Sequence, residues 1–233
     1  MKALVFDTSS VITLATNNLL WLLKPLKKKF NGKFYIAKNV KEELIDNPIR
    51  TKKFELEALA ILDMFSENYL EMINNKQLEE KTKRLLELAN HIFMVDNKYL
   101  KLVHDGEMNS LMLSITLNST YVVDERTTRL LIENPDNLHA LLEKKLHAII
   151  SVNKQNLEQF KKETANINII RSAELLVVAY EQGLLNSYIT TGKEKFHSEL
   201  KKTLLNGLLW GAKLRGCSIS TQEIDEIMKL KGF

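Results

Sequence analysis

Four acidic residues of this chain occupy positions where an α/β protein gathers the side chains of a site. Asp7 and Asp124 each directly follow a short apolar run. Glu43 lies a few residues beyond a third apolar run, and Glu107 begins a helical pattern. Because sites form at the carboxyl ends of parallel strands, we expect these four carboxylates to meet at one edge of a sheet.

Each of these acids also has an ordinary structural interpretation. A single Asp at the start of a helix is usually an N-cap, and a first-turn Glu is favoured by the helix dipole. Like charges held together, however, destabilise one another unless a cation compensates. Four carboxylates without clustered His or Cys indicate a hard cation such as Mg²⁺ or Mn²⁺, and such a site suits phosphodiester hydrolysis.

The elements that would position these acids are short buried strands alternating with helices. Three apolar runs, at residues 3–6, 34–37 and 121–123, lack polar alternation, which is typical of strands covered on both faces. A fourth and a fifth candidate strand lie near 149–152 and near 167–170. Helical patterns cover roughly 10–29, 40–45, 53–74, 78–93, 107–117, 126–133, 138–146 and 172–182, with Gly183 placed as a helix-ending glycine. The alternation predicts an α/β fold with a parallel sheet.

The C-terminal region carries helical patterns and no strand pattern. Residues 199–214 form one helical stretch, and Ser220 and Glu223 have the spacing of a capping box that opens a second helix. We therefore expect a main domain over residues 1–192 and a helical appendage over 193–233, packed on the same domain. The apolar stripe over 204–210 suits docking against the main domain or against a second subunit.

Composition limits the class of protein. The 233 residues carry 33 basic and 29 acidic side chains, a formal charge of +4, which excludes a disordered chain and permits a nucleic-acid partner. The single cysteine, Cys217, excludes an internal disulfide framework. Asp7 interrupts the N-terminal apolar run too early for a signal peptide, and no apolar stretch approaches the roughly 20 residues of a membrane span. We expect a cytoplasmic protein with no membrane partner.

Four segments of the chain resemble the motifs of PIN-domain proteins, in the same order and on matching elements. They are Asp7-Thr8-Ser9-Ser10-Val11-Ile12, Val40-Lys41-Glu42-Glu43-Leu44, Asp105-Gly106-Glu107-Met108-Asn109-Ser110-Leu111 and Val123-Asp124-Glu125-Arg126-Thr127-Thr128-Arg129. The resemblance implies a three-layer α/β/α fold around a central parallel sheet. Here that fold would carry helical insertions and the C-terminal helical appendage.

PIN-domain proteins are in many cases metal-dependent ribonucleases, so the resemblance also implies an activity. Asp7, Glu43, Glu107 and Asp124 would be the catalytic carboxylates and would bind Mg²⁺ or Mn²⁺. The implied enzyme is a hydrolase, an endoribonuclease that cuts phosphodiester bonds in single-stranded RNA.

Other residues would support these carboxylates or contact phosphate. Glu125 replaces a second Asp that many relatives have, and Arg171-Ser172 stands where relatives often show Gly-Thr. Thr8 or Ser9 would support Asp7 as an outer partner of this metal ligand. The full set of supporting or phosphate-contacting residues is Thr8, Ser9, Asp105, Glu125, Arg126, Arg171 and Ser172.

The length of the chain leaves alternatives open. Toxins of the family are typically much shorter, and the additional segments here resemble a longer archaeal-type branch. The alternatives are the toxin of a toxin–antitoxin pair, with an antitoxin-like protein partner, and a non-catalytic PIN-fold module that binds RNA or protein. A phosphatase built on Asp7 is disfavoured because Ser9 replaces the second Asp of an Asp-x-Asp pair. Family members often form homodimers, and the apolar C-terminal stripe would offer a surface for a second copy.

Overall fold

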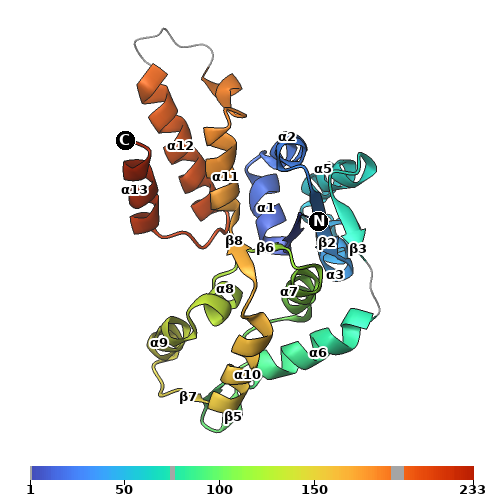
Figure 1. Ribbon diagram of the computed structural model, residues 1–233, viewed down its shortest axis with the longest axis vertical. Helices are drawn as coiled ribbons and strands as arrows, with labels where there is room; N and C mark the ends of the chain where they lie inside the picture. The colour runs from blue at the N-terminus through green and yellow to red at the C-terminus, as the bar shows by residue number, and fades with distance from the viewer. Residues whose placement is uncertain (1, 74–76, 190–196) are drawn as a thin grey trace.

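The computed structural model describes residues 2–73, 77–189 and 197–233 (Figure 1). At its centre lies a five-stranded sheet in the order β3-β2-β1-β6-β8, and every pair of neighbouring strands is parallel. The strands are β1 (Ala3–Phe6), β2 (Lys33–Ala37), β3 (Glu71–Ile73), β6 (Thr120–Val122) and β8 (Asn168–Ile170). The predicted α/β fold with a central parallel sheet is confirmed.

Helices cover both faces of this sheet and complete the three layers. Helix α7 (Asp105–Leu117) contacts β1, β2 and β6, and α1 (Thr8–Thr16) and α11 (Ser172–Glu181) contact each other on the other side (Figure 1). The core between the layers includes the buried rings of Phe6 and Phe34, whose centroids are 5.3 Å apart. Within the described part of the chain, no helix is long and apolar enough to cross a membrane.

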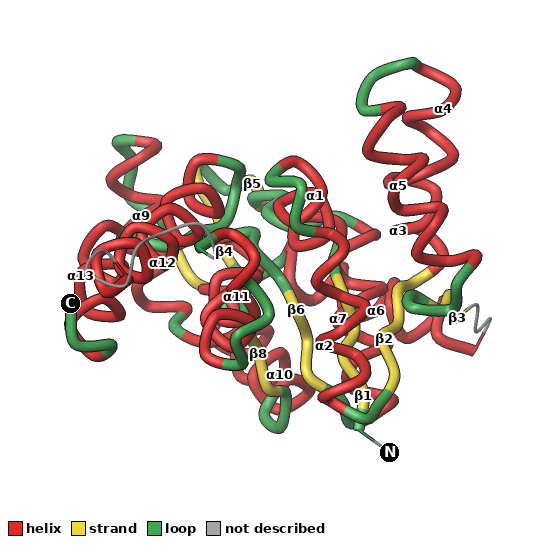
Figure 2. Tube along the Cα trace, turned by 90° about the horizontal axis from the view of Figure 1, so that it is seen from above, coloured by secondary structure: helices red, strands yellow, loops and turns green. Residues whose placement is uncertain are grey.

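The other helical elements connect and surround these layers. Figure 2 shows α4 and α5 standing out on the side of the molecule where β2 lies. In chain order, these elements are η1 (Leu20–Leu22), α2 (Leu23–Phe30), α3 (Lys38–Lys41), the π-helical turn η2 (Glu42–Asp46), α4 (Asn47–Thr51), α5 (Glu55–Ser66), α6 (Gln77–Asn90), α8 (Arg126–Glu133), α9 (Pro135–Leu146), α10 (Lys154–Thr164), η3 (Asn186–Tyr188), α12 (His197–Leu214) and α13 (Thr221–Leu230).

Two long helical patterns are shorter in the structure than the sequence predicts. The pattern over 10–29 is broken after α1, where Asn18 adopts a left-handed conformation with φ of 55° that Asn tolerates better than most residues. The pattern over 53–74 ends at Ser66, and residues 71–73 form the edge strand β3 instead. Residue 74, the predicted end of that helix, lies outside the described residues.

A second, smaller sheet joins two segments that are far apart in the sequence. Strand β4 (Phe93–Val95) pairs antiparallel with both β5 (Lys98–Tyr99) and β7 (Ser151–Val152). The strand predicted near 149–152 therefore exists as β7, but it belongs to this sheet and not to the parallel one. Its pairing is continued by a hydrogen bond of 2.7 Å from the Asn153 amide to the Ile92 carbonyl.

The two inserted segments thus form one unit below the main sheet in Figure 1. Helix α6 from the first segment contacts α10 from the second, and Arg84 forms an ion pair of 2.8 Å with Glu163 across them. Neither β4, β5 nor α10 was predicted from the sequence. Their runs are short or strongly polar, and they are stabilised by contacts with the other segment.

The C-terminal helices dock on the main domain through the predicted apolar stripe. Leu205, Leu208 and Leu209 of α12 are buried, and α12 contacts α11. Of the two partners considered for this stripe, the main domain is the one that the structure shows. The predicted boundary between residues 192 and 193 lies outside the described residues.

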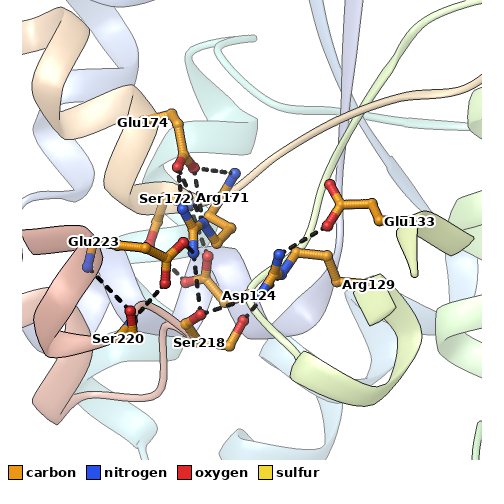
Figure 3. A network of polar contacts seen from close by, with 9 residues as sticks. All are labelled: Asp124, Arg129, Glu133, Arg171, Ser172, Glu174, Ser218, Ser220 and Glu223. Carbon is orange, nitrogen blue, oxygen red and sulfur yellow. Dashed lines mark hydrogen bonds and ion pairs between the residues drawn. The ribbon is translucent and has the colours of Figure 1, made fainter. Parts of the chain in front are cut away.

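A polar network fastens α13 to the ends of β6 and β8 (Figure 3). The Arg171 guanidinium donates to Glu174 at 2.5 Å, to Glu223 at 2.7 Å and to the Ser218 carbonyl at 3.1 Å. Ser220 and Glu223 form the predicted capping box, in which the Ser220 amide donates to Glu223 and the Glu223 amide donates to Ser220 Oγ. One charged group therefore ties the appendage to the sheet.

This network predicts a pH-dependent contribution of Glu223 to stability. Desolvation opposes its charge, but hydrogen bonds from Ser220 and Arg171 prevail and lower the pKa of Glu223 to about 2. Because the folded-state pKa is depressed, the stabilisation is present above about pH 4.5 and is lost as the pH falls towards 2. Urea unfolding should show Glu223→Gln to be less stable than wild type by about 1 kcal/mol at pH 7, with the difference shrinking towards pH 2.5.

Glu226→Gln is the matched control on the same helix, because Glu226 is exposed and accepts a hydrogen bond of 3.1 Å from Gln222, one turn earlier on α13. A difference between Glu223→Gln and wild type that stays constant from pH 7 to pH 2.5 would contradict this role.

Candidate active site

Asp7 lies at the carboxyl end of β1 and caps the N-terminus of α1. Its carboxylate is 3% exposed and accepts hydrogen bonds from the Ser9 amide at 3.1 Å and from Ser9 Oγ at 2.7 Å. Ser9 Oγ in turn accepts a hydrogen bond of 3.0 Å from the Asp124 amide. The Ser9 hydroxyl therefore bridges the ends of the neighbouring strands β1 and β6.

Asp124 follows β6, but its carboxylate is directed towards a different partner. It is fully buried and accepts from the Ser172 amide at 2.7 Å and from Ser172 Oγ at 2.6 Å, so that both oxygens are bonded at the start of α11 (Figure 3). Its charge also acts on the buried Cys217, where desolvation and Asp124 raise the pKa of the thiol to about 12. Asp124 thus connects the strand end to α11 and to the C-terminal turn.

Glu43 lies in the π-helical turn after α3 and reaches towards α1 and α7. One of its carboxylate oxygens accepts a hydrogen bond of 2.5 Å from Thr8 Oγ1. A Cβ atom placed on Gly106 would lie 2.6 Å from Glu43 Oε1, so a side chain at this position would displace the Glu43 carboxylate from the start of α7.

Glu107 lies in the first turn of α7, half-buried among other acids. One of its oxygens accepts a hydrogen bond of 2.6 Å from the His104 amide. Desolvation nevertheless raises the pKa of Glu107 to about 7. The negative charges of Asp7, Glu125 and Glu43 add to this rise, which places these three side chains within electrostatic reach of Glu107.

Glu125 and Tyr121 contribute more to this cluster than the sequence indicates. Glu125 caps α8 by accepting a hydrogen bond of 2.6 Å from the Thr128 amide, and its charge acts on Glu107. The buried Tyr121 hydroxyl donates to the Glu107 carbonyl at 3.3 Å. Desolvation, with the charges of Asp7 and Glu107, raises the pKa of Tyr121 well above its usual value. Tyr121 was assigned to a core strand, and no feature of the sequence distinguishes it from its apolar neighbours.

The remaining predicted residues lie around this cluster. Asp105 accepts a hydrogen bond from the Asn39 side chain, and Arg126 is exposed at the start of α8. Arg171, predicted as a phosphate contact, is instead bonded to Glu174 and Glu223 and is mostly buried. The contacts of Arg171 are therefore those of a residue that holds α11 and α13 together.

The cluster formed by Asp7, Glu43, Glu107 and Glu125 is described below as the carboxylate cluster. Each of these side chains accepts a hydrogen bond from Ser9, Thr8, His104 or Thr128, and no three acidic, His or Cys side chains of the described residues stand as a ready set of metal ligands. Their oxygen-only chemistry and their shared negative charge nevertheless fit a hard divalent cation.

Comparisons of the chain with protein-family models, with curated proteins and with solved structures found no match.

The two aspartates should respond in opposite ways to neutralisation. Burial, with a smaller effect of the Glu43 charge, raises the pKa of Asp7 to about 6 against the hydrogen bonds from Ser9. Because the folded-state pKa is raised, the charged carboxylate destabilises the fold as the pH rises from about 4 through 6. We expect Asp7→Asn to raise the free energy of unfolding at pH 8 by about 1–3 kcal/mol, measured by urea unfolding in EDTA.

Asp124→Asn is the matched control, because its amide oxygen replaces only one of the two oxygens that accept from Ser172, and it should lower stability at the same pH. A destabilising effect of Asp7→Asn at pH 8 would contradict the charge crowding described above.

Proposed function

We propose that this protein is a metal-dependent endoribonuclease with a PIN-like fold, which hydrolyses phosphodiester bonds in single-stranded RNA. The single observation that carries the proposal is the carboxylate cluster, in which Asp7, Glu43, Glu107 and Glu125 come from four different elements and share one electrostatic environment. A fold gains no stability from holding like charges together, so the arrangement indicates a function.

The order of the strands supports the same proposal. Strands β1 and β6 are neighbours in the sheet, so the acids that follow them meet at its carboxyl edge, where parallel sheets place their sites. The four segments that resemble PIN-domain motifs supply these acids in order.

In this proposal the carboxylates of Asp7, Glu43, Glu107 and Glu125 would hold Mg²⁺ or Mn²⁺. When bound, such an ion lowers the pKa of a coordinated water and neutralises charge on phosphate. Ser9 keeps the Asp7 carboxylate aimed at the cluster, and Thr8 does the same for Glu43. Arg126, exposed at the start of α8 beside Glu125, is placed to contact a phosphate of the RNA.

Asp124 has a supporting part in this proposal. Since both of its oxygens accept from Ser172, it orients the strand end from behind the cluster, and Glu125 faces the cluster in its place. The longer side chain of Glu125, compared with an aspartate, lets its carboxylate both cap α8 and lie near Glu107.

Cleavage of labelled single-stranded RNA in Mn²⁺ tests the activity. Glu43→Gln and Glu107→Gln should each lower the rate by about 100-fold or more, because even the outer partners of metal ligands typically change activity by 10–100-fold. The neighbouring Glu42→Gln is the matched control, since Glu42 points to Lys38, at 3.6 Å, and should retain activity. Cleavage that survives in both cluster variants would refute the proposal.

Metal binding can be measured without turnover. Because an ion that binds only the folded state stabilises it, Mn²⁺ at 100 times its dissociation constant should stabilise wild type by about 2.7 kcal/mol. Thermal unfolding in Mn²⁺ and in EDTA should show this difference for wild type and Glu42→Gln, and little of it for Asp7→Asn. An equal Mn²⁺ effect on Asp7→Asn would place the ion elsewhere.

A second candidate is a non-catalytic module of the same fold that binds RNA or protein. It is favoured by the hydrogen bonds that each acid of the cluster already accepts from within the protein. Binding of RNA without cleavage in saturating Mn²⁺ would support this candidate. The homodimer and the antitoxin-like partner stay predictions.

A further inference from the structure

Helices α4 and α5 form an arm that stands out from the rest of the molecule (Figure 2). One face of α5 is covered within the protein, since α5 contacts α1, α4 and η2. Ala58, Ile61 and Met64, which follow one another at three-residue spacing, are buried on this face. These contacts hold the arm on the main domain.

The other face of α5 is apolar as well, but it lies open. Its three leucines, Leu56, Leu59 and Leu62, are 77%, 53% and 42% exposed and are called the leucine face below. They too are spaced three residues apart, so they share one side of the helix. A helix that is apolar on both sides is normally buried on both, and a contiguous exposed apolar patch marks an interaction site. The leucine face therefore indicates an interface.

The tip of the arm, where α4 ends and α5 begins, is positively charged. Arg50, Lys52 and Lys53 are exposed there, and within the described ranges of the chain the structure shows no ion pair for them. Glu55 and Glu57 follow in the first turn of α5 and offset two of these three charges. The tip thus keeps a net positive charge.

The base of the arm, where α5 ends, is negatively charged. Asp63 and Glu67 share a single cation, Lys24, at 3.4 Å and 2.6 Å. Their side chains are still 54% and 45% exposed, so each can accept a second cation. The 12 residues of α5 separate tip and base by about 18 Å, with the leucine face between them.

We propose that the leucine face binds the leucine face of a second copy of this chain, with the two arms antiparallel about a two-fold axis. In this arrangement the positive tip of each arm lies against the negative base of the other, and Leu59 lies near the axis. A two-fold interface uses the same patch on both copies, so it needs a surface that is complementary to itself. The arm meets this condition through its unlike ends.

The arm also replaces the other surface considered for a second copy. The apolar stripe of α12 is buried against the main domain, as Leu205, Leu208 and Leu209 show. Because only one arm from each copy takes part, the contact is small, and we expect a weak dimer that forms as the protein concentration rises. None of these residues belongs to the carboxylate cluster, so the oligomeric state is measured independently of RNA cleavage.

Sedimentation velocity of the full chain from about 1 μM to about 500 μM tests the dimer, a range that covers micromolar dissociation constants. Wild type should change from monomer to dimer over this range. Leu59→Glu should weaken dimerisation about 100-fold or more, because each copy would bury an unpaired charge. Ile149→Glu is the matched control, since Ile149 is 89% exposed on the inserted segment before β7, and it should dimerise as wild type does.

Leu59 is half exposed, so Leu59→Glu should keep the urea midpoint of wild type at concentrations where both are monomeric. A wild type that stays monomeric over the whole range would overturn the proposal and leave the leucine face to a different protein. A dimer that persists in Leu59→Glu would place the interface elsewhere and would overturn it as well.

Cysteine cross-linking tests the position of the axis. The native Cys217 is 3% exposed, so an added surface cysteine is the group that reacts. A short bis-maleimide should join Leu59→Cys into a covalent dimer and should leave Ile149→Cys largely monomeric. Equal cross-linking of the two variants would contradict the assigned axis.

The charges at the tip distinguish antiparallel from parallel arms. Lys52→Ala combined with Lys53→Ala should weaken dimerisation about fivefold at low salt, as the loss of exposed ion pairs does, and should reduce its dependence on salt. In a parallel pair the two tips would repel each other, so the same variant would dimerise more tightly than wild type. Tighter dimerisation would therefore overturn the antiparallel arrangement.

Discussion

The candidate site depends on the two hydrogen bonds of the Ser9 hydroxyl. The hydroxyl donates to the Asp7 carboxylate and accepts from the Asp124 amide, and so it joins the ends of two adjacent parallel strands through one oxygen atom. Parallel pairing of β1 and β6 brings these ends together, and the bridge fixes the direction in which Asp7 faces. Asp7 is then committed to a buried, negatively charged environment that raises its pKa to about 6, chiefly through desolvation. Because the carboxylate is buried, its ionisation at neutral pH destabilises the fold.

The parts of the chain beyond the central sheet are arranged around this edge. The two inserted segments meet through β4 and β7 and through α6 and α10, and α6 also packs against α7. On the other side, Arg171 and Ser218 tie the C-terminal helices to the strand end that carries Asp124. Both additions contact the elements that bear the acids, so each can influence what binds there.

Much of the central architecture could be predicted because it is encoded locally. The runs at 3–6, 34–37 and 121–123 are short, apolar and free of alternation, as is typical of strands covered on both faces, and each overlaps a strand of the parallel sheet. The capping box at Ser220 opens α13 as predicted, because its two hydrogen bonds join residues only three positions apart. Strands β3, β4 and β5 were missed, since they are two or three residues long and partly exposed. In addition, β3 pairs with β2 and β4 pairs with β7, which lie far away in the sequence.

The sequence by itself determined the fold class and the positions of Asp7, Glu43 and Glu107, because strand ends and helix starts are marked by local composition. Only the tertiary structure decided which way each carboxylate faces. Asp124 and Glu125 are adjacent in the chain, yet the first is bonded to Ser172 and the second acts on Glu107. Side-chain direction depends on residues that approach from distant segments, such as Ser172, and no pattern within a few residues of Asp124 contains that information.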